Sequence, residues 1–361
     1  MYILVLVLAV GGGLWLVARG FDVGNRRQIV NGLLLAAGTL AVFGLMSFWG
    51  EMLWFENLGF EERFWRVIWA RGFIGVAAAL LAAGTTMIVF HVAGPSVRRI
   101  MSAFALAAGT LWSFAFWQET VLFVFGKATT TTDPILGLST SFYLFTLPFL
   151  DGLFWLALVL AVSGLFVVLT AGGTGVPMQF AGTGDEPKNG LAIPIASAFV
   201  AAVLGFGTLL RVFHLLYSDL GVVNGPGWTD VHVRLPALVG LAVVFVVAGV
   251  VPLSGRFRAM MSRLAASRVP VVPPHVTATI AAWLAVGAAW VVAVIVTPGL
   301  VQWLVVKPNE ITFEAPYIAN NIEFTRRGFG LDDVEEREFS PSADFGLRQV
   351  EDNENLLSEV R

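Results

Sequence analysis

The stretch LPFLDGLFWLALVLAVSGLFVVL, residues Leu147–Leu169, decides the fold class of this chain. A helix needs about 20 apolar residues to cross roughly 30 Å of hydrocarbon, and this stretch is long enough, with Asp151 near one end as its only ionisable residue. In lipid every backbone polar group must be bonded internally, so only helices and closed barrels span a membrane. The run is too long and too continuous for a barrel strand, and it predicts a membrane-spanning helix.

The composition extends this conclusion to most of the chain. Hydrophobic residues make up 57% and charged residues 13% of the 361 positions, and the mean hydropathy is +0.79. So little polar surface cannot cover soluble globules of this size, which excludes a soluble enzyme. The absence of cysteine excludes disulfides, thiolate metal sites, iron–sulfur clusters and cysteine nucleophiles.

Eight stretches are apolar enough to span or nearly so, which predicts an all-α, polytopic transmembrane bundle of seven to eight helices within residues 1–306. The first stretch is expected to be a retained anchor, because its positive residues follow the apolar run, whereas a signal peptide carries them ahead of it. The segment 100–117 is the least apolar of the set. The predicted spans lie near 3–17, 29–49, 73–92, 100–117, 147–169, 191–210, 235–251 and 276–296.

The distribution of Lys and Arg predicts the orientation, because short loops rich in these residues face the cytoplasm. The odd-numbered loops hold ten such residues and the even-numbered loops six, so both termini are expected outside the cell membrane. The ten are Arg19, Arg26, Arg27, Arg98, Arg99, Lys188, Arg256, Arg258, Arg263 and Arg268.

The C-terminal segment differs from the membrane body in charge. Residues 1–306 carry 16 Lys and Arg against 12 Asp and Glu, whereas residues 307–361 carry 6 against 13. We expect 307–361 to be an acidic extracytoplasmic tail, with one amphipathic helix over 316–329, and to be the start of a soluble domain of a longer protein. An acidic tail repels nucleic acid, which is not an expected partner.

Two sets of residues mark the predicted outer interface. The run SFWGEMLWFENLGFEERFWRVIW (47–69) mixes aromatic rings with charges, which is typical of a helix or helix-turn-helix lying along the membrane surface. A grip on a sugar or a lipid headgroup is the alternative for this run. Pro148 and Pro236, each within a Leu-Pro pair, are expected to mark helix starts, since proline is tolerated in a first turn.

Candidate functional residues are few, because ionisable groups inside spans are rare and therefore informative. Glu119 is a candidate ion or proton site if the fourth helix extends through Phe125. In the outer loops, Asp219, Asp230 and His232 lie near one another in sequence, where a calcium or zinc contact is an open alternative to side chains that simply face water. Asp133 is a further outer-loop candidate. The histidine spacing matches no metal motif, and no nucleophile elbow or phosphate-binding loop is present, so neither a metal nor a cofactor is expected.

Four long segments together resemble the uncharacterised integral membrane protein family 0182, large multi-pass proteins of actinobacteria and other bacteria. They are LWFENLGF (53–60), WQETVLFVFGKATTTTDPILGLSTSFYLFTLPFL (117–150), LLYSDLGVVNGPGWTDVHVRLPAL (215–238) and VVKPNEITFEAPYIANNIEFTRRGFGLDDVE (305–335). The resemblance implies a membrane body of seven helices followed by a large extracytoplasmic domain, with an additional apolar segment here before Arg26. It supplies no activity that could be assigned to a residue.

Three hypotheses compete for the function. The first is a membrane anchor or scaffold that holds an extracytoplasmic domain at the cell envelope, where envelope proteins and the lipid bilayer would be its partners. The second is a transporter or channel with Glu119 in its path. The third is a membrane enzyme acting on envelope or lipid-linked substrates through Asp133, Asp219 and Asp230. The scarcity of ionisable residues within the spans favours the first, non-enzymatic hypothesis.

Overall fold

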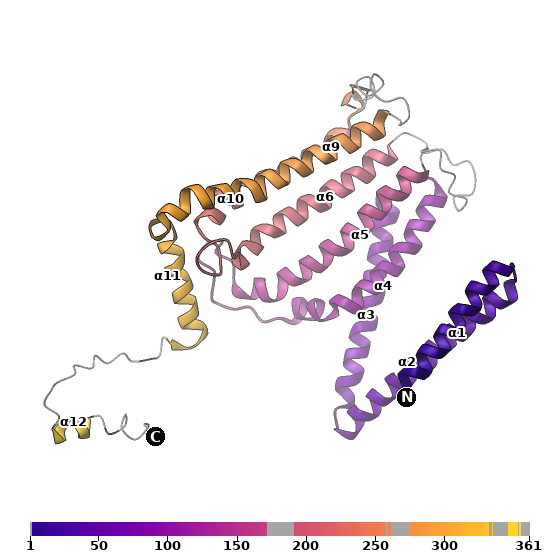
Figure 1. The fold of residues 1–361 in the computed structure, drawn as a ribbon, viewed down its shortest axis with the longest axis horizontal. Helices are drawn as coiled ribbons and strands as arrows, with labels where there is room; N and C mark the ends of the chain where they lie inside the picture. The colour runs from indigo at the N-terminus through magenta and orange to yellow at the C-terminus, as the bar shows by residue number, and fades with distance from the viewer. Residues whose placement is uncertain are drawn as a thin grey trace. The chain divides into compact units, whose positions relative to one another are not determined.

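The structure, a computed structural model, describes residues 2–171, 191–257, 259–260, 274–331, 334, 346–352 and 354 (Figure 1). Helices dominate these ranges, in which no β-strand forms and a single isolated bridge joins Thr132 to Ser139. The predicted all-α class is confirmed. The predicted cytoplasmic residues Lys188, Arg258, Arg263 and Arg268, and most of the acidic segment after Leu331, lie outside the described residues.

The helices follow the apolar runs of the sequence but extend beyond them. The long helices are α1 (Tyr2–Val23), α2 (Arg26–Asn57), α3 (Glu61–Val89), α4 (Pro95–Phe125), α5 (Leu147–Ala171), α6 (Ala192–Phe213), α7 (Leu235–Val250) and α9 (Pro274–Val291). They are followed by α10 (Thr297–Val301), α11 (Glu310–Gly328) and α12 (Leu347–Asp352). Several of the long helices exceed the roughly 20 residues that cross a bilayer.

Among the described residues, eight helices are long and apolar enough to cross a membrane. The predicted segment 100–117 lies within one of them, Pro95–Phe125. The eighth runs from Trp283 to Gly328, but its apolar residues end at Val306, and α11 is polar, with five charged side chains. We therefore treat α11 as lying outside the spanning segments.

The chain divides into two compact units. One comprises Met1–Phe213 and Ala237–Val292, and the other comprises His214–Pro236 and Ala293–Arg361. Most of the spanning helices belong to the first unit. The second unit combines the loop between α6 and α7 with α10, α11 and the turns that connect them.

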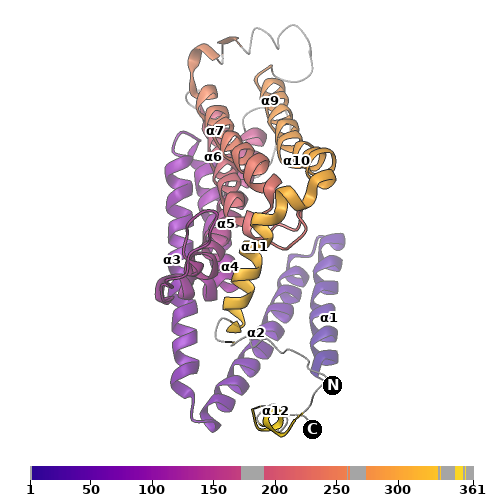
Figure 2. The same cartoon turned by 90° about the vertical axis from the view of Figure 1, so that its left-hand side faces the viewer.

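Within the first unit, small residues bring neighbouring helices into close contact. The pairs α1 and α2, α3 and α4, and α5 and α6 run side by side (Figure 2). A Cβ atom added at Gly13 would lie 2.8 Å from the carbonyl oxygen of Gly32, and one added at Gly109 would lie 2.6 Å from that of Ala78. Helices in lipid associate through this close backbone packing, because burial of apolar surface gives little driving force there.

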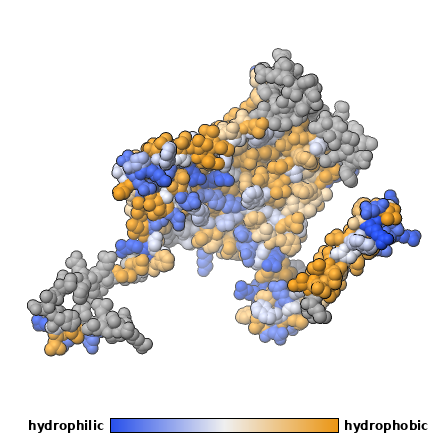
Figure 3. Space-filling view, viewed as in Figure 1, coloured by the Kyte–Doolittle hydropathy of each residue, from blue (hydrophilic) through white to orange (hydrophobic). Residues whose placement is uncertain are grey.

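The outer surfaces of the helices are apolar. Phe73, Leu81 and Phe125 are each more than two-thirds exposed. Apolar residues cover long stretches of the helices in the space-filling view (Figure 3). In a soluble protein such exposure would cause aggregation, whereas lipid-facing helices require it.

A tight turn joins α2 to α3, where the aromatic run was predicted to lie along the membrane surface. Gly59 takes a left-handed conformation with φ of +71°, which a residue without a Cβ adopts without strain. The helix-turn-helix form is present, but its aromatic residues occupy the ends of two long helices and not separate short ones.

Four prolines follow wider π-helical turns. The turn η1 (Phe142–Thr146) precedes Leu147-Pro148, and the turn η3 (Asp230–Arg234) precedes Leu235-Pro236. The same pattern recurs in η5 (Val292–Val296) before Thr297-Pro298 and in η6 (Gln302–Val306) before Lys307-Pro308. Proline lacks an N–H and its ring clashes with the carbonyl four residues earlier, and a wider preceding turn relieves that conflict. The α-helical portions do begin at the two predicted Leu-Pro pairs, but helical structure begins earlier.

The helix predicted over 316–329 begins six residues earlier, at Glu310, and ends at Gly328. Pro316 is inside α11 and does not mark its start. The 3-10 turn η7 (Lys307–Asn309) leads into α11, so the chain is helical without interruption from Thr297 to Gly328.

Candidate functional site

The loop between α6 and α7 is folded around Ser218, which is buried. It begins with the 3-10 turn η2 (His214–Tyr217). The Ser218 carbonyl accepts a hydrogen bond from Gly225 N at 2.8 Å, and its hydroxyl accepts one from Arg234 Nη1 at 3.2 Å. Gly225 has φ of +125°, which only glycine adopts readily. These bonds close the loop on itself.

Asp230 is the fully buried acidic residue of this loop. Its Oδ1 atom accepts a hydrogen bond from Arg234 Nη1 at 2.7 Å, one turn along η3, and its Oδ2 atom accepts one from Gly227 N at 3.2 Å. The arginine supplies the opposite charge that a buried carboxylate requires. Asp230 therefore fixes the conformation of the residues that face α11.

Glu314 of α11 enters the same region from a distant part of the sequence. Its side chain is 1% exposed, and its Oε2 atom accepts a hydrogen bond from Trp228 N at 3.3 Å. A Cβ atom at position 227 would lie 2.9 Å from that oxygen, so Gly227 leaves the space that the carboxyl group occupies. The absence of a side chain at 227 is thus a structural requirement for seating Glu314.

Two further hydrogen bonds join the loop to the helical segment after Val292. The buried Thr229 hydroxyl donates to Gln302 Oε1, and Asn321 Nδ2 donates to the carbonyl oxygen of Asn224 at 2.7 Å. We call the set Ser218, Gly227, Thr229, Asp230, Arg234, Gln302 and Glu314 the α11 clamp. Together with the Trp228 N–H and Asn321, these residues join the loop to η6 and to the polar helix α11.

Aromatic rings cover one side of the α11 clamp. The Trp228 ring stacks on His232 at 4.5 Å between centroids, and it meets Phe313 at 5.0 Å. The His232 Nδ1 atom lies 3.0 Å from the Trp228 carbonyl oxygen. Trp228 thus contacts η3 through His232 and α11 through Phe313.

Burial changes the acidity of two α11 side chains. Loss of water around the carboxyl group raises the pKa of Glu314 above its ordinary value. The hydrogen bond from the Trp228 N–H lowers this pKa, and the negative charge of Asp230 raises it further. Burial, followed by the charge of Glu314, raises the pKa of the Tyr317 hydroxyl. Glu314 is therefore biased toward its neutral form.

The structure places three of the sequence candidates in this loop. Asp230 is part of the α11 clamp and is buried instead of facing water, and His232 stacks on the Trp228 ring. Asp219 is exposed. No group of three or more His, Asp or Glu side chains among the described residues is arranged to hold a metal ion.

Asp133 organises a different loop, between α4 and α5. Its carboxylate is 4% exposed and accepts hydrogen bonds from the backbone N–H groups of Ile135, Leu136 and Leu138 at 2.6 to 2.9 Å. The Tyr143 hydroxyl donates a fourth, at 2.8 Å. Both oxygens of Asp133 are thus engaged in holding the turn.

Glu119 lies inside α4, because the helix does extend to Phe125. Its Oε2 atom is buried and has no hydrogen-bond partner. The helix is distorted close by, at Phe116, where φ is −118° and ψ is 19°. The next residue, Trp117, packs under Arg71, with 4.4 Å between the guanidinium carbon and the ring centroid.

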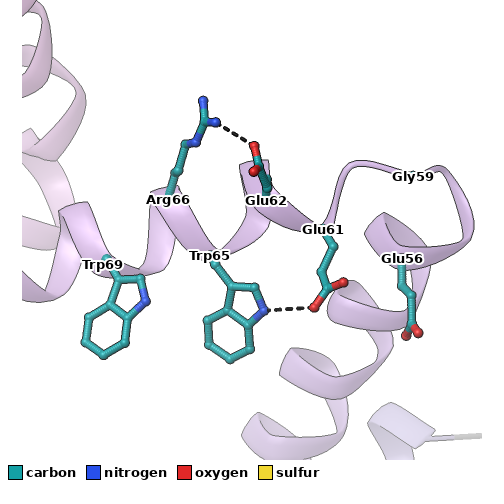
Figure 4. A pocket seen from close by; sticks show the side chains of 7 residues that line it. All are labelled: Glu56, Gly59, Glu61, Glu62, Trp65, Arg66 and Trp69. Carbon is teal, nitrogen blue, oxygen red and sulfur yellow. Dashed lines mark hydrogen bonds and ion pairs between the residues drawn. The ribbon is translucent and has the colours of Figure 1, made fainter.

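The turn between α2 and α3 forms an open pocket lined by Glu56, Gly59, Glu61, Glu62, Trp65, Arg66 and Trp69. Figure 4 shows Trp65 and Trp69 one turn apart on the same side of α3, with Arg66 and Glu62 directed away from them. The Trp65 indole N–H donates to Glu61 at 3.4 Å, and Arg66 pairs with Glu62 at 2.5 Å. The ion pair is highly exposed, so it adds little stability.

Sequence reasoning missed Glu314, Gln302, Thr229 and Arg234. Glu314 lies 86 positions from Trp228, and Gln302 lies 73 from Thr229, so no local pattern connects them. One signal in the sequence was Gln302, which lies within an apolar run. A polar side chain that is buried there requires a hydrogen-bond partner.

Comparison with known proteins gives a consistent result. The profile of an uncharacterised protein family (UPF0182) matches residues 93–361. UPF0182 proteins of Geobacter sp. (strain M21) and Synechococcus sp. (strain JA-3-3Ab) are 28% and 29% identical, over 88% and 93% of this chain. The chain spans only 37% and 40% of the length of these two relatives. No solved structure matches.

Proposed function

The chain belongs to the uncharacterised protein family UPF0182, and from that premise we propose that it is a membrane anchor that orients an extracytoplasmic segment at the cell envelope. The α11 clamp is the observation that carries this proposal. If the chain after Val306 were a flexible tether, α11 would need no contacts with buried residues of the loop. Here Glu314 and Asn321 of α11 bond to Trp228 and Asn224, and Gln302 of the preceding turn η6 bonds to Thr229.

The continuity of the helix supports the same function. From Thr297 to Gly328 the chain passes from apolar to polar residues without a non-helical linker. A continuous helix transmits direction, whereas a coil linker samples many directions. In this proposal α11 gives a defined path to the acidic segment that follows it, where envelope proteins would bind.

Single-cysteine labelling tests the proposed orientation, because the chain has no cysteine of its own. Ser342→Cys and Ser262→Cys are made separately and exposed to a membrane-impermeant maleimide on intact cells. We expect labelling of Ser342→Cys only. Labelling of Ser262→Cys only would reverse the topology and contradict an envelope anchor.

A second experiment tests the fixed path of α11. Hydrogen exchange of the full protein in lipid should show slow exchange of α11 amides. Asn321→Ala removes the bond to Asn224 and should speed exchange in the second half of α11, whereas the adjacent Asn320→Ala serves as the matched control. Fast exchange throughout α11 in the unaltered protein would contradict an orienting function.

Transport is a second candidate function, which the buried Oε2 atom of Glu119 favours. An unpartnered carboxyl oxygen inside a spanning helix is costly and is typical of ion or proton pathways. Glu119→Gln should abolish solute or ion flux into proteoliposomes if Glu119 lies in a path. Absence of flux in the unaltered protein across monovalent cations, anions and protons would remove this candidate.

A further inference from the structure

The buried charges of the α11 clamp do not balance. Asp230 and Glu314 are both almost fully buried, and one arginine, Arg234, lies with them. Arg234 pairs with Asp230 at 2.7 Å and also donates to Ser218. Glu314 receives hydrogen bonds from neutral groups, the Trp228 backbone N–H and the Gln302 side chain. If Glu314 were ionised, one negative charge in this buried cluster would have no paired cation among the described residues.

The second oxygen of Glu314 is also without a partner. The Oε1 atom is buried and accepts no hydrogen bond. It faces the backbone of Gly227, where an added Cβ atom would lie only 3.1 Å away. An ionised carboxylate in this position would be strongly disfavoured, because it loses water and gains only neutral donors, the Trp228 N–H and the Gln302 side chain, in return.

A bound cation would remove the imbalance, and the available ligands decide which cation fits. Calcium takes six to eight oxygen ligands and magnesium requires a near-octahedral set. Both oxygens of Asp230 already accept hydrogen bonds, and Gln302 Oε1 accepts one from Thr229. This leaves Glu314 Oε1 as the available carboxylate oxygen of the α11 clamp. One such oxygen is too few to bind a metal ion but is enough to bind a proton.

We infer that Glu314 is a proton-binding site, at which one proton neutralises the buried carboxyl group and thereby keeps α11 seated on the loop. The inference rests on the proposed function, since it concerns how α11 is held. It assigns the proton as the ligand and Glu314 as the residue that binds it.

The other titratable groups around Glu314 determine the sign of the pH effect. Asp230 and Arg234 face it from η3, and Glu310 and Tyr317 are on its own helix. Lys307, on η7, is exposed to solvent. Burial raises the pKa of Glu314 in the docked state, and the charges of Asp230 and Glu310 raise it further, against hydrogen bonds from Trp228 and Gln302. The docked state therefore binds the proton more tightly than the released state does. The contribution of this proton to docking is fully present below the ordinary carboxyl pKa of 4.5 and is lost as the pH rises through the raised value.

Infrared difference spectroscopy of the full protein in lipid tests the site directly. Spectra recorded at increasing pH should show loss of the C=O stretch of a protonated carboxylic acid, with a midpoint above that of ordinary glutamates. The band should be absent in Glu314→Gln and present in Glu323→Gln, the matched control, because Glu323 is half-exposed on the same helix and pairs with Arg327. Asp230→Asn removes a neighbouring negative charge and should lower the midpoint, by on the order of one pH unit.

Hydrogen exchange of residues 225–234 gives the second measurement. The protection of these amides is compared among the variants at each pH. It should decline as the pH rises in the unaltered protein and in Glu323→Gln. It should remain constant in Glu314→Gln, because the neutral amide mimics the protonated acid. Persistence of the infrared band in Glu314→Gln would overturn the inference, as would a midpoint that falls when sodium replaces a bulky cation at constant ionic strength. Constant protection with no titrating band would overturn the proton site alone, whereas absent protection at every pH would overturn the orienting function as well.

Discussion

Trp228 donates its backbone N–H to Glu314 Oε2 at 3.3 Å, although the two residues are 86 positions apart in the sequence. The bond joins the loop between α6 and α7 to the polar helix after the last apolar run. Because Glu314 is buried and Gly227 leaves room for its carboxyl group, this contact fixes the position of α11 on the loop.

The bond between Thr229 and Gln302 should be important for the stability of the second unit. Thr229→Val keeps the shape but leaves Gln302 Oε1 buried without a donor, which should cost about 1 to 3 kcal/mol. Adding Gln302→Met should recover part of that loss, because both polar groups are then gone. Thermal unfolding and hydrogen exchange of residues 225–234 measure both effects. Thr39→Val, on α2, is the control because the Thr39 hydroxyl donates to Leu35 of its own helix, and an equal effect there would contradict this assignment.

Asp133 should be required for the conformation of the loop between α4 and α5. Asp133→Asn replaces one accepting oxygen by an NH2 group, which cannot accept from Leu138 N or from the Tyr143 hydroxyl, and should cost about 1 to 3 kcal/mol. Tyr143→Phe removes one bond and should have a smaller effect. Limited proteolysis of residues 127–141 measures the loss of order. Asp219→Asn, at an exposed position, should leave proteolysis unchanged; equal cleavage in the two aspartate variants would contradict the structural role.

Close packing of α3 against α4 should make Gly109 intolerant of any side chain. Gly109→Ala places a Cβ atom 2.6 Å from the carbonyl oxygen of Ala78 and should destabilise the protein by about 1 to 3 kcal/mol. Gly84→Ala is the matched control, because a Cβ atom there meets nothing within 4 Å. That change should be neutral or stabilising by up to about 1 kcal/mol, since alanine favours helix. Similar melting temperatures for the two variants in detergent would refute the packing argument.

The hydrogen bond between Trp112 and Gly152 should contribute to packing of α4 against α5. The indole Nε1–H donates to the Gly152 carbonyl oxygen at 2.6 Å, and both groups lie within the first unit. Trp112→Phe should lower stability by about 0.5 to 1.5 kcal/mol beyond the loss of apolar area. Trp155→Phe, which alters a largely exposed indole, provides the comparison. A larger loss at Trp155 would contradict the prediction.

The sequence predicts the fold class well, because in a bilayer the hydrogen bonds of a spanning helix join residues that are close in sequence. A run such as Leu147–Leu169 must be helical in lipid whatever its neighbours are, since each residue bonds within its own helix. Helix boundaries were predicted less well. The π-helical turn η1 extends helical structure five residues before the expected start at Leu147, because a wider turn accommodates Pro148 inside a longer helical segment.

The candidate site depends on contacts that no local pattern contains. Asp230 was identified as a candidate from its position in an outer loop, but its burial follows from Arg234 and Gly227, which the spacing did not connect to it. Glu314 had no signal of its own, because in a polar helix a buried glutamate resembles an exposed one. Its position became clear only from the folded chain.

The π-helical turn η6 also sets the direction in which α11 faces. A wider turn inserts about one extra residue, which rotates everything after it by about 100° relative to a continuous α-helix. Glu314 faces Trp228 with that extra residue in place, and we expect it to turn away without it. The α11 clamp therefore depends on the rotation of α11 about its own axis as well as on its residues. Removing one residue from 302–306 would keep every side chain of α11 but turn the Glu314 carboxyl group away from the loop.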